Sequence, residues 1–357
     1  MTCRVLVLGA GSIGSYVGGA LAAAGADVTF VGRPRLLDEL RASGLRLTDL
    51  DGRDERVAPD AFRTATSTAG VDAADLVLIC VKSRDTASAA SELAGRLAPG
   101  TVVVSLQNGI GNDTVIRELL PTCVVLPGMV MFNVVHHGGG RFHRGTAGGI
   151  AVADDPALDR FRPVLDRSRL GVRRYPDLLP VQWAKLLLNL NNPINALSGR
   201  PLREQLAQRD YRRCLALAQR EALRAMARAR IRPARLTALP PELMARLLTV
   251  PDAVFTRVAG TVLAVDPVAR SSMADDLAAG RSTEIAWLSG EIVSLGKIVG
   301  MPTPVNQRLV ELVTAAENGD RRTWSGAELL AELGAAADRS AVGNIRANPG
   351  DQRSNQG

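Results

Sequence analysis

One lysine and two asparagines stand in an apolar stretch of the second half of the chain, LLPVQWAKLLLNLNNPINALS (residues 178–198). Lys185, Asn189 and Asn192 are spaced i, i+4, i+7, which predicts one shared face of a helix over 178–192. Loss of hydration would lower the lysine pKa toward values useful for proton donation at neutral pH. An amine and two carboxamides together can bind a carbonyl or a carboxylate. The alternative is a lysine whose head group reaches solvent, beside asparagines that cap a helix.

A glycine-rich segment near the N-terminus, VLVLGAGSIG (residues 5–14), has the chemistry to bind a dinucleotide. Four apolar residues run into G-x-G-x-x-G, which predicts a buried strand, a tight turn and a helix start. Gly9 allows the turn, Gly11 lets a pyrophosphate approach the backbone, and Gly14 lets the helix pack on the strand. The alternative is a structural turn. The residues expected to contact the dinucleotide are Gly9, Ala10, Gly11, Ser12, Ile13 and Gly14.

The end of the second predicted strand, DVTFV (residues 27–31), indicates which dinucleotide is bound. A carboxylate there would accept hydrogen bonds from the adenosine ribose and repel a 2′-phosphate. The strand is followed by Arg33, and its one acid, Asp27, lies at the opposite end. Arg33 therefore favours NADP(H) over NAD(H), the alternative being an ordinary solvated arginine.

Two more polar residues follow buried strands. Lys82 comes after DLVLICV and Asn108 comes after TVVVS, so both lie where strand carboxyl ends border a cofactor crevice. Lys82 could instead be a surface lysine. For Asn108, an Asn-Gly turn and an amide that contacts nicotinamide or substrate are equally good interpretations.

A polar cluster runs from Ser271 through Glu284 in the second half. Gly280 ends one predicted helix, and Ser282 is expected to cap the next, which places Glu284 in its first turn. Taken alone, Ser272 and Glu284 fit a solvated face and an ordinary helix cap.

The elements that must position these residues change character near residue 175. The first part alternates strands with helices, which predicts an α/β domain with a doubly wound, mostly parallel sheet. From 177 onward the pattern is helical, and 340–357 is polar and expected to be disordered. The predicted strands are 5–8, 27–31, 45–48, 56–57, 75–81, 101–105, 123–126, 129–135, 149–152 and 171–174. The predicted helices are 12–24, 35–42, 85–97, 155–167, 178–192, 203–230, 241–248, 253–278, 282–299, 303–317 and 327–336.

Composition excludes several classes of function. A chain of 357 residues with 46% hydrophobic and 22% charged residues is typical of a globular protein, and no apolar run is long enough to span a bilayer. We therefore expect a cytoplasmic protein without a membrane partner. The net charge of +7 comes with few aromatic residues, so the arginines between 203 and 235 favour a solvated helical face over a nucleic-acid site.

Neither the cysteines nor the histidines predict a metal site. The cysteines are isolated, which favours buried free thiols. The histidines surround a triple glycine without a carboxylate or cysteine at ligand spacing, which favours a polar hairpin. These residues are Cys3, Cys80, Cys123, Cys214, His136, His137 and His143.

Six motifs, in order over residues 4–315, resemble the ketopantoate reductase (2-dehydropantoate 2-reductase) family. They are GAGSIG at 9–14, Arg33, Val81-Lys82, LQNGIGN at 106–112, WAKLLLN at 183–189 with Asn192-Pro193, and SSM at 271–273 with Thr283-Glu284-Ile285. The resemblance implies an N-terminal Rossmann domain and a C-terminal all-α domain with the active site between them. We divide the chain accordingly into an NADP-binding domain (1–175), a substrate and catalytic domain (176–320) and an extension (321–357).

The resemblance implies an NADP-dependent oxidoreductase acting on CH–OH groups, which reduces 2-dehydropantoate to (R)-pantoate in pantothenate biosynthesis. Lys185 matches the catalytic lysine that gives a proton to the ketone oxygen while NADPH delivers hydride to the carbon. Asn189 and Asn192 match the asparagines that orient substrate, and Ser272 matches the serine near its carboxylate. Glu284 matches the glutamate that approaches the cofactor.

The remaining matches concern the cofactor. Lys82 and Asn108 match residues that bracket nicotinamide and substrate, and Arg33 matches the 2′-phosphate contact. Val134 falls where the family uses a backbone contact to the cofactor.

Three departures from the family pattern concern the substrate. The spacing from Lys185 to Asn192 is one residue shorter, and Ala269 and Leu202 stand where the family often has asparagines. Another small 2-oxo acid or ketone is therefore an alternative substrate, and a non-catalytic NADP(H)-binding sensor is the alternative of another class. Small-residue helices leave room for a homodimer interface.

Overall fold

The computed structural model describes residues 3–70, 73–258, 269–320 and 322–346, with side chains through Arg339. The chain divides into two compact units, residues 1–186 and 187–357. The domain limits given above, with a boundary at 175/176, stay a prediction.

The first unit is built on an eight-stranded sheet. Its strands are β1 (Arg4–Leu8), β2 (Asp27–Val31), β5 (Phe62–Ala65), β6 (Leu76–Ile79), β7 (Val102–Ser105), β8 (Val124–Val130), β11 (Ile150–Ala153) and β12 (Arg173–Tyr175). They lie in the order β12-β11-β8-β7-β6-β1-β2-β5, and every neighbouring pair is parallel except β8 with β11. The predicted mostly parallel sheet is confirmed.

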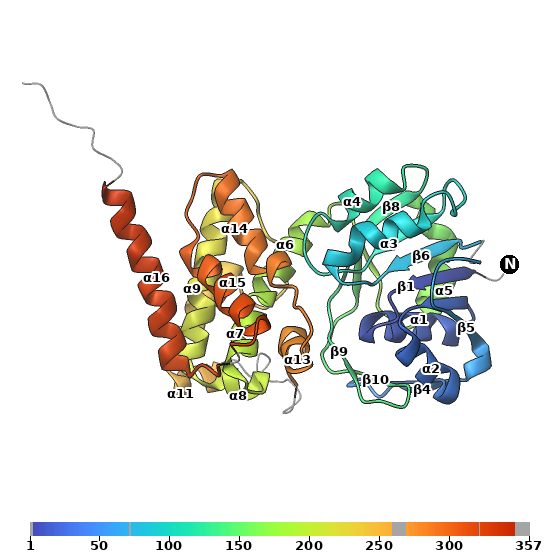
Figure 1. Cartoon of the computed structure of the whole chain (residues 1–357), viewed down its shortest axis with the longest axis horizontal. Helices are drawn as coiled ribbons and strands as arrows, with labels where there is room; N and C mark the ends of the chain where they lie inside the picture. Colours follow the sequence, from blue (N-terminus) through green and yellow to red (C-terminus); the bar gives the residue numbers. More distant parts are fainter. Residues whose placement is uncertain (1–2, 71–72, 259–268, 321, 347–357) are drawn as a thin grey trace, which may run out of the picture. The chain divides into compact units, whose positions relative to one another are not determined.

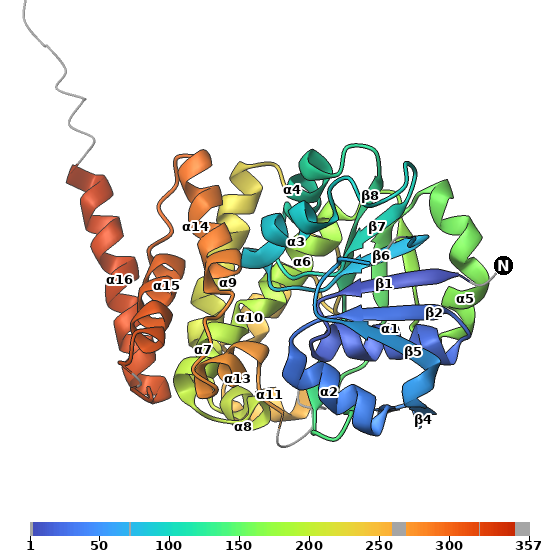
Figure 2. The same cartoon turned by 45° about the vertical axis from the view of Figure 1, so that its right-hand side comes forward.

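Helices cover both faces of this sheet (Figure 1). Val5 and Val7 of β1 point into one core, and Leu6 and Leu8 point into the other, so the strand is buried on both sides. On the first face lie α1 (Ser12–Ala23), η3 (Pro156–Phe161) and α5 (Arg162–Arg167); on the second lie α3 (Thr86–Leu93) and α4 (Asn112–Leu119). Figure 2 shows the strands fanning across this layered unit with the usual twist.

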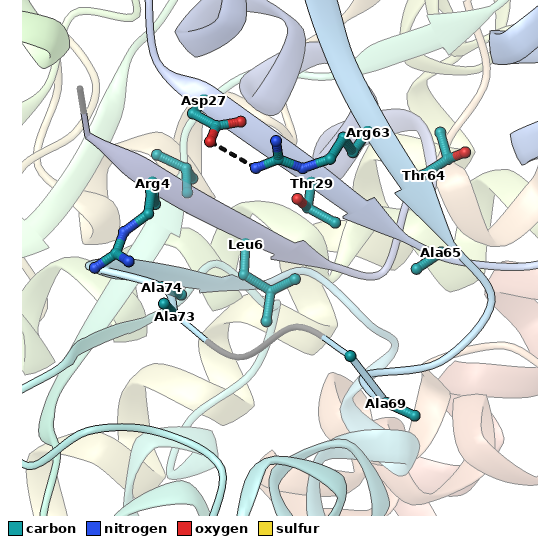
Figure 3. A pocket seen from close by; sticks show the side chains of 12 residues that line it. Arg4, Leu6, Asp27, Thr29, Arg63, Thr64, Ala65, Ala69, Ala73 and Ala74 are labelled. Atoms are coloured by element: carbon teal, nitrogen blue, oxygen red, sulfur yellow. Dashed lines mark hydrogen bonds and ion pairs between the residues drawn. The ribbon is translucent and has the colours of Figure 1, made fainter.

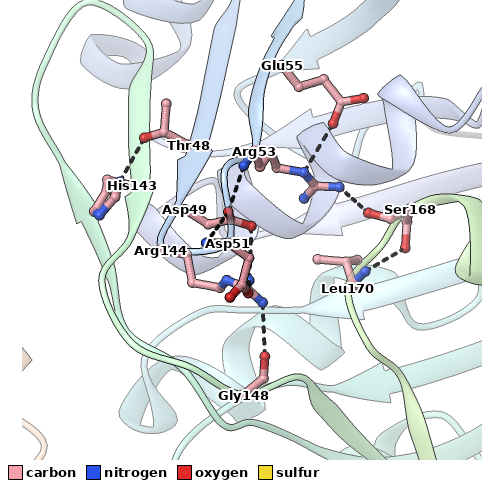
Figure 4. Close-up of polar contacts among 10 residues, drawn as sticks. All are labelled: Thr48, Asp49, Asp51, Arg53, Glu55, His143, Arg144, Gly148, Ser168 and Leu170. Carbon is pink, nitrogen blue, oxygen red and sulfur yellow. Dashed lines mark hydrogen bonds and ion pairs between the residues drawn. The ribbon is translucent and has the colours of Figure 1, made fainter. Parts of the chain in front are cut away.

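A second, smaller sheet packs against α1. Its strands β3 (Leu45–Asp49), β4 (Asp54–Val57), β9 (Val134–His136) and β10 (Arg141–Arg144) lie in the order β4-β3-β10-β9, next to α2 (Pro34–Ser43) and η1 (Pro59–Ala61). Ion pairs and hydrogen bonds of two buried arginines hold this sheet in place. Arg144 pairs with Asp49 at 2.9 Å and also with Asp51, and Arg53 donates to the Ser168 carbonyl at the end of α5 (Figure 4).

Several boundaries predicted for the first unit are wrong. The helix expected over 85–97 begins as η2 (Ser83–Asp85) and ends at Leu93, because Gly95 adopts a left-handed φ of 73°. The strand expected over 129–135 is two strands, since β8 continues through Pro127 and Gly128 to Val130. Helix α4 and strand β5 were not predicted, and β10 was predicted only as part of a polar hairpin.

The second unit is helical throughout the part that the structure describes. Helix α6 (Leu179–Asn189) crosses the division between the units. After it come α7 (Asn191–Ser198), α8 (Leu202–Ala207), α9 (Arg209–Arg228), α10 (Pro241–Leu247), α11 (Asp252–Val258), α13 (Ser272–Ala278), η4 (Ile285–Trp287), α14 (Ser289–Ile298), α15 (Pro304–Glu317) and α16 (Gly326–Arg346). The predicted all-α region is confirmed.

Helix α9 is the centre of this unit, and two of its charged residues are buried. Glu221 accepts hydrogen bonds from the backbone N–H groups of Val305 and Asn306, so it supplies the N-terminal cap of α15. Arg212 has no exposed surface and donates to carbonyl groups between α8, α10 and α11. For Arg212, the expected solvated face is wrong.

Corrections also apply to the predicted helices of this unit. The helix expected over 203–230 is broken at Gln208, and the one expected over 282–299 begins as η4. Of the helix expected over 253–278, the structure shows α11 and α13, and 259–268 lies outside the described residues. Helix α16 runs to Arg346, so disorder from 340 is wrong as far as that residue; 347–357 lies outside the described residues.

Candidate active site

Four neighbouring parallel strands of the first unit end at one level. In the strand register, Leu8 of β1 pairs with Val31 of β2 and with Ile79 of β6, and Ile79 pairs with Ser105 of β7. In open parallel sheets, ligands bind just beyond such carboxyl ends. This edge is therefore the place to look for the cofactor residues.

Except for Val134, the cofactor residues expected in this unit all follow one of these four ends. Gly9 directly follows β1, and its N–H donates to the Val31 carbonyl of β2 at 2.9 Å. Arg33 follows β2, Lys82 follows β6 and Asn108 follows β7. The structure thus brings the glycine loop and three polar side chains to one edge of the sheet.

Glycine stands at the three positions of the fingerprint for different physical reasons. A side chain at Gly9 would meet the Val81 backbone nitrogen at 2.6 Å, and φ there is +104°. A side chain at Gly14 would meet the Gly9 carbonyl oxygen at 2.2 Å, so packing of α1 on β1 requires glycine. At Gly11 a Cβ would meet nothing within 4 Å, and φ is −80°, which any residue adopts.

Among the described residues, none comes close enough to Gly11 to require glycine there. A ligand that approaches this backbone would require it. Gly11 is also the N-cap of α1, which has no side-chain cap and no acidic residue in its first turn. The positive end of the helix is thus left for an anion such as a pyrophosphate.

Arg33 lies at the start of α2. It is the N-cap residue, its side chain is exposed, and Gly32 and Val31 connect it to β2. In this position the guanidinium can reach a phosphate on a ribose at the end of β2. Of the neighbouring residues, Pro34 and Arg35 are also exposed and carry no negative charge.

Side chains that the sequence analysis did not single out lie beneath Lys82 and Asn108. Ser83 Oγ donates to the Asn108 carbonyl at 2.7 Å, and Asn112 Nδ2 donates to the same oxygen at 2.8 Å. The turns after β6 and β7 are therefore joined through one backbone carbonyl. The polar run LQNGIGN contained the signal, but Gln107 and Asn112 are also common turn and cap residues.

Lys185 lies in α6 among apolar neighbours. The residues around it in the helix, Trp183, Ala184, Leu186 and Leu187, are each at most 4% exposed, while Lys185 itself is half-buried. Loss of hydration lowers the pKa of Lys185 from 10.5 to about 8. This value suits a group that must hold and release a proton near neutral pH.

The single helix face expected for the lysine and the two asparagines is wrong. Helix α6 ends at Asn189, Leu190 forms a turn, and α7 begins at Asn191. Lys185 and Asn189 remain one helical turn apart on α6, whereas Asn192 belongs to α7. Pro193 is tolerated in the first turn of α7, where its missing N–H would have no helical partner.

Within the second unit, α7 and α13 bring Asn192 close to the serine pair. Ser271 is the N-cap of α13, and its hydroxyl donates to the Asn192 carbonyl at 3.3 Å. The Ser271 N–H donates to Oδ1 of the buried Asn195 at 2.9 Å. Ser272, the first residue of α13, is exposed.

Glu284 is 7% exposed and precedes the short helix η4. The expectation that Ser282 caps a helix whose first turn contains Glu284 is wrong, because Glu284 itself occupies the N-cap position. The Thr283 N–H donates to the Glu317 carboxylate at 2.6 Å, which holds this segment against α15.

The two substitutions that depart from the family pattern touch each other. The Leu202 N–H donates to the Ala269 carbonyl at 2.8 Å, where α8 begins. Leu202 is 9% exposed. A backbone hydrogen bond thus joins two positions where the family pattern often has amides and this chain has apolar side chains.

The histidines form the expected polar hairpin of β9 and β10. His136 Nε2 lies 2.7 Å from Glu39 Oε1, and His143 Nδ1 lies 2.8 Å from Thr48 Oγ1. Val134 is the first residue of β9 and is partly buried. The four cysteines are free thiols.

A pocket of about 420 Å³ opens on the sheet face formed by β1, β2 and β5 (Figure 3). Leu6 and Thr29 lie on its floor, and an Asp27–Arg63 ion pair crosses it. It lies over the strands rather than beyond their carboxyl ends, so it is not the dinucleotide site. Within the described residues, no helix is long and apolar enough to cross a membrane, and no cluster of three or more metal-ligating side chains occurs.

Comparison with known proteins identifies the family of the chain. The family model "Ketopantoate reductase PanE/ApbA" matches residues 5–156, and its C-terminal counterpart matches 177–317. A 2-dehydropantoate 2-reductase of Halobacterium salinarum is 33% identical over 88% of this chain and 99% of that protein. The crystal structure of a PanE/ApbA family ketopantoate reductase from Ralstonia eutropha JMP134 has a TM-score of 0.74 at 29% identity, over 88% of this chain and 98% of that one.

D-mandelate dehydrogenase, solved with NADH and anilino(oxo)acetate, shares the fold with a TM-score of 0.72 at 21% identity, over 88% of this chain and 98% of that one. The two family models and the relatives together cover both the sheet edge and the helix of Lys185. The chain belongs to the ketopantoate reductase family, whose members are dinucleotide-binding oxidoreductases.

Proposed function

We propose that the protein reduces 2-dehydropantoate to (R)-pantoate with NADPH, as a step of pantothenate biosynthesis. The observation that carries this proposal is Lys185, a half-buried lysine whose pKa is lowered to about 8, in the helix that matches the family's C-terminal domain. The named 2-dehydropantoate 2-reductases that share 33% and 29% identity with the chain support the same substrate.

The residues at the sheet edge fit a dinucleotide. The open space at Gly11 and the uncapped N-terminus of α1 would hold the pyrophosphate, with Gly9, Ala10, Ser12, Ile13 and Gly14 around it. Arg33 would bind a 2′-phosphate, which supports NADPH over NADH. When bound, NADPH supplies the hydride for the ketone carbon.

Lys185 would protonate the ketone oxygen. Its ammonium group is the main form at neutral pH when the pKa is about 8, so the proton is available. The positive charge also stabilises the alkoxide that develops on this oxygen, and in a site poor in water this effect is large.

The neighbouring amides and hydroxyls would hold the substrate. Asn189 lies one helical turn after Lys185, so its amide can bind the same end of the substrate. We assign Asn192 and Ser272 to substrate binding as well, supported by the contact that joins α7 to the N-terminus of α13. Glu284 and the pair Lys82 and Asn108 would contact the nicotinamide end of the cofactor, Asn108 also facing substrate.

A second candidate keeps the mechanism and changes the substrate to another small 2-oxo acid or ketone. It is favoured by Leu202 and Ala269, since apolar side chains stand where the family pattern often has asparagines. A site without these amides selects a substrate hydroxyl less strongly than a site built to hydrogen-bond it. The candidate from another class, a non-catalytic NADP(H) sensor, requires Lys185 to have no part in turnover.

A substrate panel separates these candidates. Steady-state oxidation of NADPH and NADH is measured with 2-dehydropantoate, with 2-oxoisovalerate, which lacks the hydroxymethyl group, and with benzoylformate. The proposal predicts the highest kcat/KM for 2-dehydropantoate with NADPH. A higher value for either of the other acids identifies the second candidate, and turnover with none of them, despite tight NADPH binding, contradicts the proposed reaction and favours the sensor.

We also propose that the protein forms a homodimer and lies in the cytoplasm.

A further inference from the structure

Five buried polar side chains form a connected chain of hydrogen bonds beneath the turns that follow β6 and β7. All five are at most 7% exposed, and they come from both strand ends and from the two helices that follow them. They are Ser83, Thr86, Ser105, Gln107 and Asn112. Burying polar groups costs free energy unless they are hydrogen-bonded, so five such groups in one place require an explanation.

The first half of this chain fixes Gln107. The Ser105 hydroxyl donates to Gln107 Oε1 at 3.0 Å, and Gln107 Nε2 donates to Thr86 Oγ1 at 2.7 Å and to the Val81 carbonyl at 3.1 Å. Because a carbonyl oxygen only accepts, the contact with Val81 fixes which end of the amide carries the N–H groups. Gln107 therefore joins the end of β7 to the turn after β6.

The second half fixes Asn108 from below. Thr86 Oγ1 lies 2.7 Å from the Ser83 carbonyl oxygen and 3.1 Å from Asn112 Oδ1. Asn112 Nδ2 donates to the Asn108 carbonyl at 2.8 Å and to Ser83 Oγ at 3.3 Å. The Ser83 hydroxyl donates to the same Asn108 carbonyl at 2.7 Å. Two donors on different elements thus hold one peptide group.

Thr86 is the residue on which both halves depend. Its hydroxyl contacts Gln107, the Ser83 carbonyl and Asn112, and it lies in the first turn of α3. Removing only this oxygen takes one acceptor from the Gln107 Nε2 group, which keeps the Val81 carbonyl, and takes the Thr86 hydroxyl donor from Asn112 Oδ1. A buried polar group that loses a hydrogen bond rearranges or admits water, which moves the turns.

We propose that this chain positions the nicotinamide end of the cofactor, with Thr86, Gln107 and Asn112 as its positioning residues. It rests on the proposed function, in which Lys82 and Asn108 contact that end. Lys82 directly precedes Ser83 in the sequence, and the Asn108 carbonyl accepts hydrogen bonds from Ser83 and Asn112. The positions of the Lys82 and Asn108 side chains therefore depend on this chain of hydrogen bonds. None of the positioning residues needs to touch the substrate.

The test compares two threonine-to-valine substitutions of equal size. Thr86→Val removes the central hydroxyl. Thr101→Val, the control, removes a buried hydroxyl that lies 3.5 Å from the Ala74 carbonyl at the amino end of β7, on the opposite edge of the sheet. Calorimetry measures the binding of NADPH and of 2′-phospho-ADP-ribose, which has the whole cofactor except the nicotinamide ring.

The proposal predicts that Thr86→Val weakens NADPH binding about tenfold, the effect of one lost buried hydrogen bond, and leaves binding of the fragment unchanged. Thr101→Val should change neither. Equal losses for NADPH and the fragment, or no loss for either, would overturn it. Thr86→Ser keeps the hydroxyl oxygen and should bind NADPH as the wild type does. If Thr86→Val does not fold, an equal weakening of NADPH binding and fragment binding in Thr86→Ser overturns the proposal.

These measurements need no substrate, so they distinguish this inference from the proposed function. A wild-type protein that binds NADPH and ignores 2-dehydropantoate contradicts the proposed reaction, while the comparison of Thr86 with Thr101 still decides the role of the buried chain. A wild-type protein that binds the fragment as tightly as NADPH overturns the inference directly.

Discussion

The pH dependence of ketone reduction should report the lowered pKa of Lys185. With a pKa of about 8, about nine tenths of the lysine is protonated at pH 7 and about one tenth at pH 9. Because reduction needs the ammonium form, kcat/KM should fall about tenfold over this interval. Oxidation of the alcohol needs the free amine, so its kcat/KM should rise through the same pH.

The assay follows the loss of NADPH absorbance with the best substrate of the panel at several pH values. Lys185→Arg is the matched variant, since arginine stays protonated; its lower activity should be nearly independent of pH between 7 and 9. The exposed Lys297 offers a control, because Lys297→Arg should keep the wild-type profile.

A lysine with an ordinary pKa of 10.5 would still be almost fully protonated at pH 9. Wild-type kcat/KM for reduction that stays constant from pH 7 to 9 would therefore refute the reasoning about burial. A fall that persists in Lys185→Arg would assign the titration to another group.

Three further predictions concern stability and cofactor choice. Lys185→Met should raise the free energy of unfolding at pH 7 by up to about 3 kcal/mol in thermal or urea denaturation. This gain should shrink as pH rises from 8 to 10.5, because the native lysine then loses its charge and becomes neutral like methionine. A gain that is independent of pH would contradict this prediction. Arg33→Ala should weaken NADPH binding about 10- to 100-fold in calorimetry and leave NADH binding unchanged. The control is Arg56→Ala, which changes an exposed arginine of β4. Equal losses for both dinucleotides would count against a phosphate contact. Gly11→Ala should change the free energy of unfolding by less than about 0.5 kcal/mol and weaken dinucleotide binding, whereas Gly14→Ala should lower the free energy of unfolding by about 3 kcal/mol or more. The opposite order of the two losses would show that packing, not a ligand, requires Gly11.

Sequence patterns predicted the parallel sheet well because its strands are buried on both faces. Continuous apolar runs such as VLVL and LVLI have few alternative explanations, and the predicted bounds of β2 agree with the structure at both ends. The small second sheet was only partly predicted. Its strands are short and half-exposed, and β10, RFHR, has three residues that also suit a polar loop.

The candidate site was likewise predicted only in part. The glycine loop and the strand-end residues follow from local spacing and lie at one edge as expected. The break at Leu190 could not be predicted, because the turn contains neither glycine nor proline, and Pro193 falls three residues later. The buried chain around Thr86 joins residues 83 to 112 through space, and no local pattern carries that information.

The central claim is that Lys185 donates the proton in an NADPH-dependent reduction of 2-dehydropantoate. The most direct measurement is the turnover of 2-dehydropantoate at saturating NADPH by the wild type and by Lys185→Ala, with NADPH binding measured on both proteins. We predict that the variant binds NADPH as the wild type does and loses about 10²- to 10⁴-fold in kcat. Turnover by Lys185→Ala within a factor of a few of the wild type, with NADPH bound, would contradict the claim.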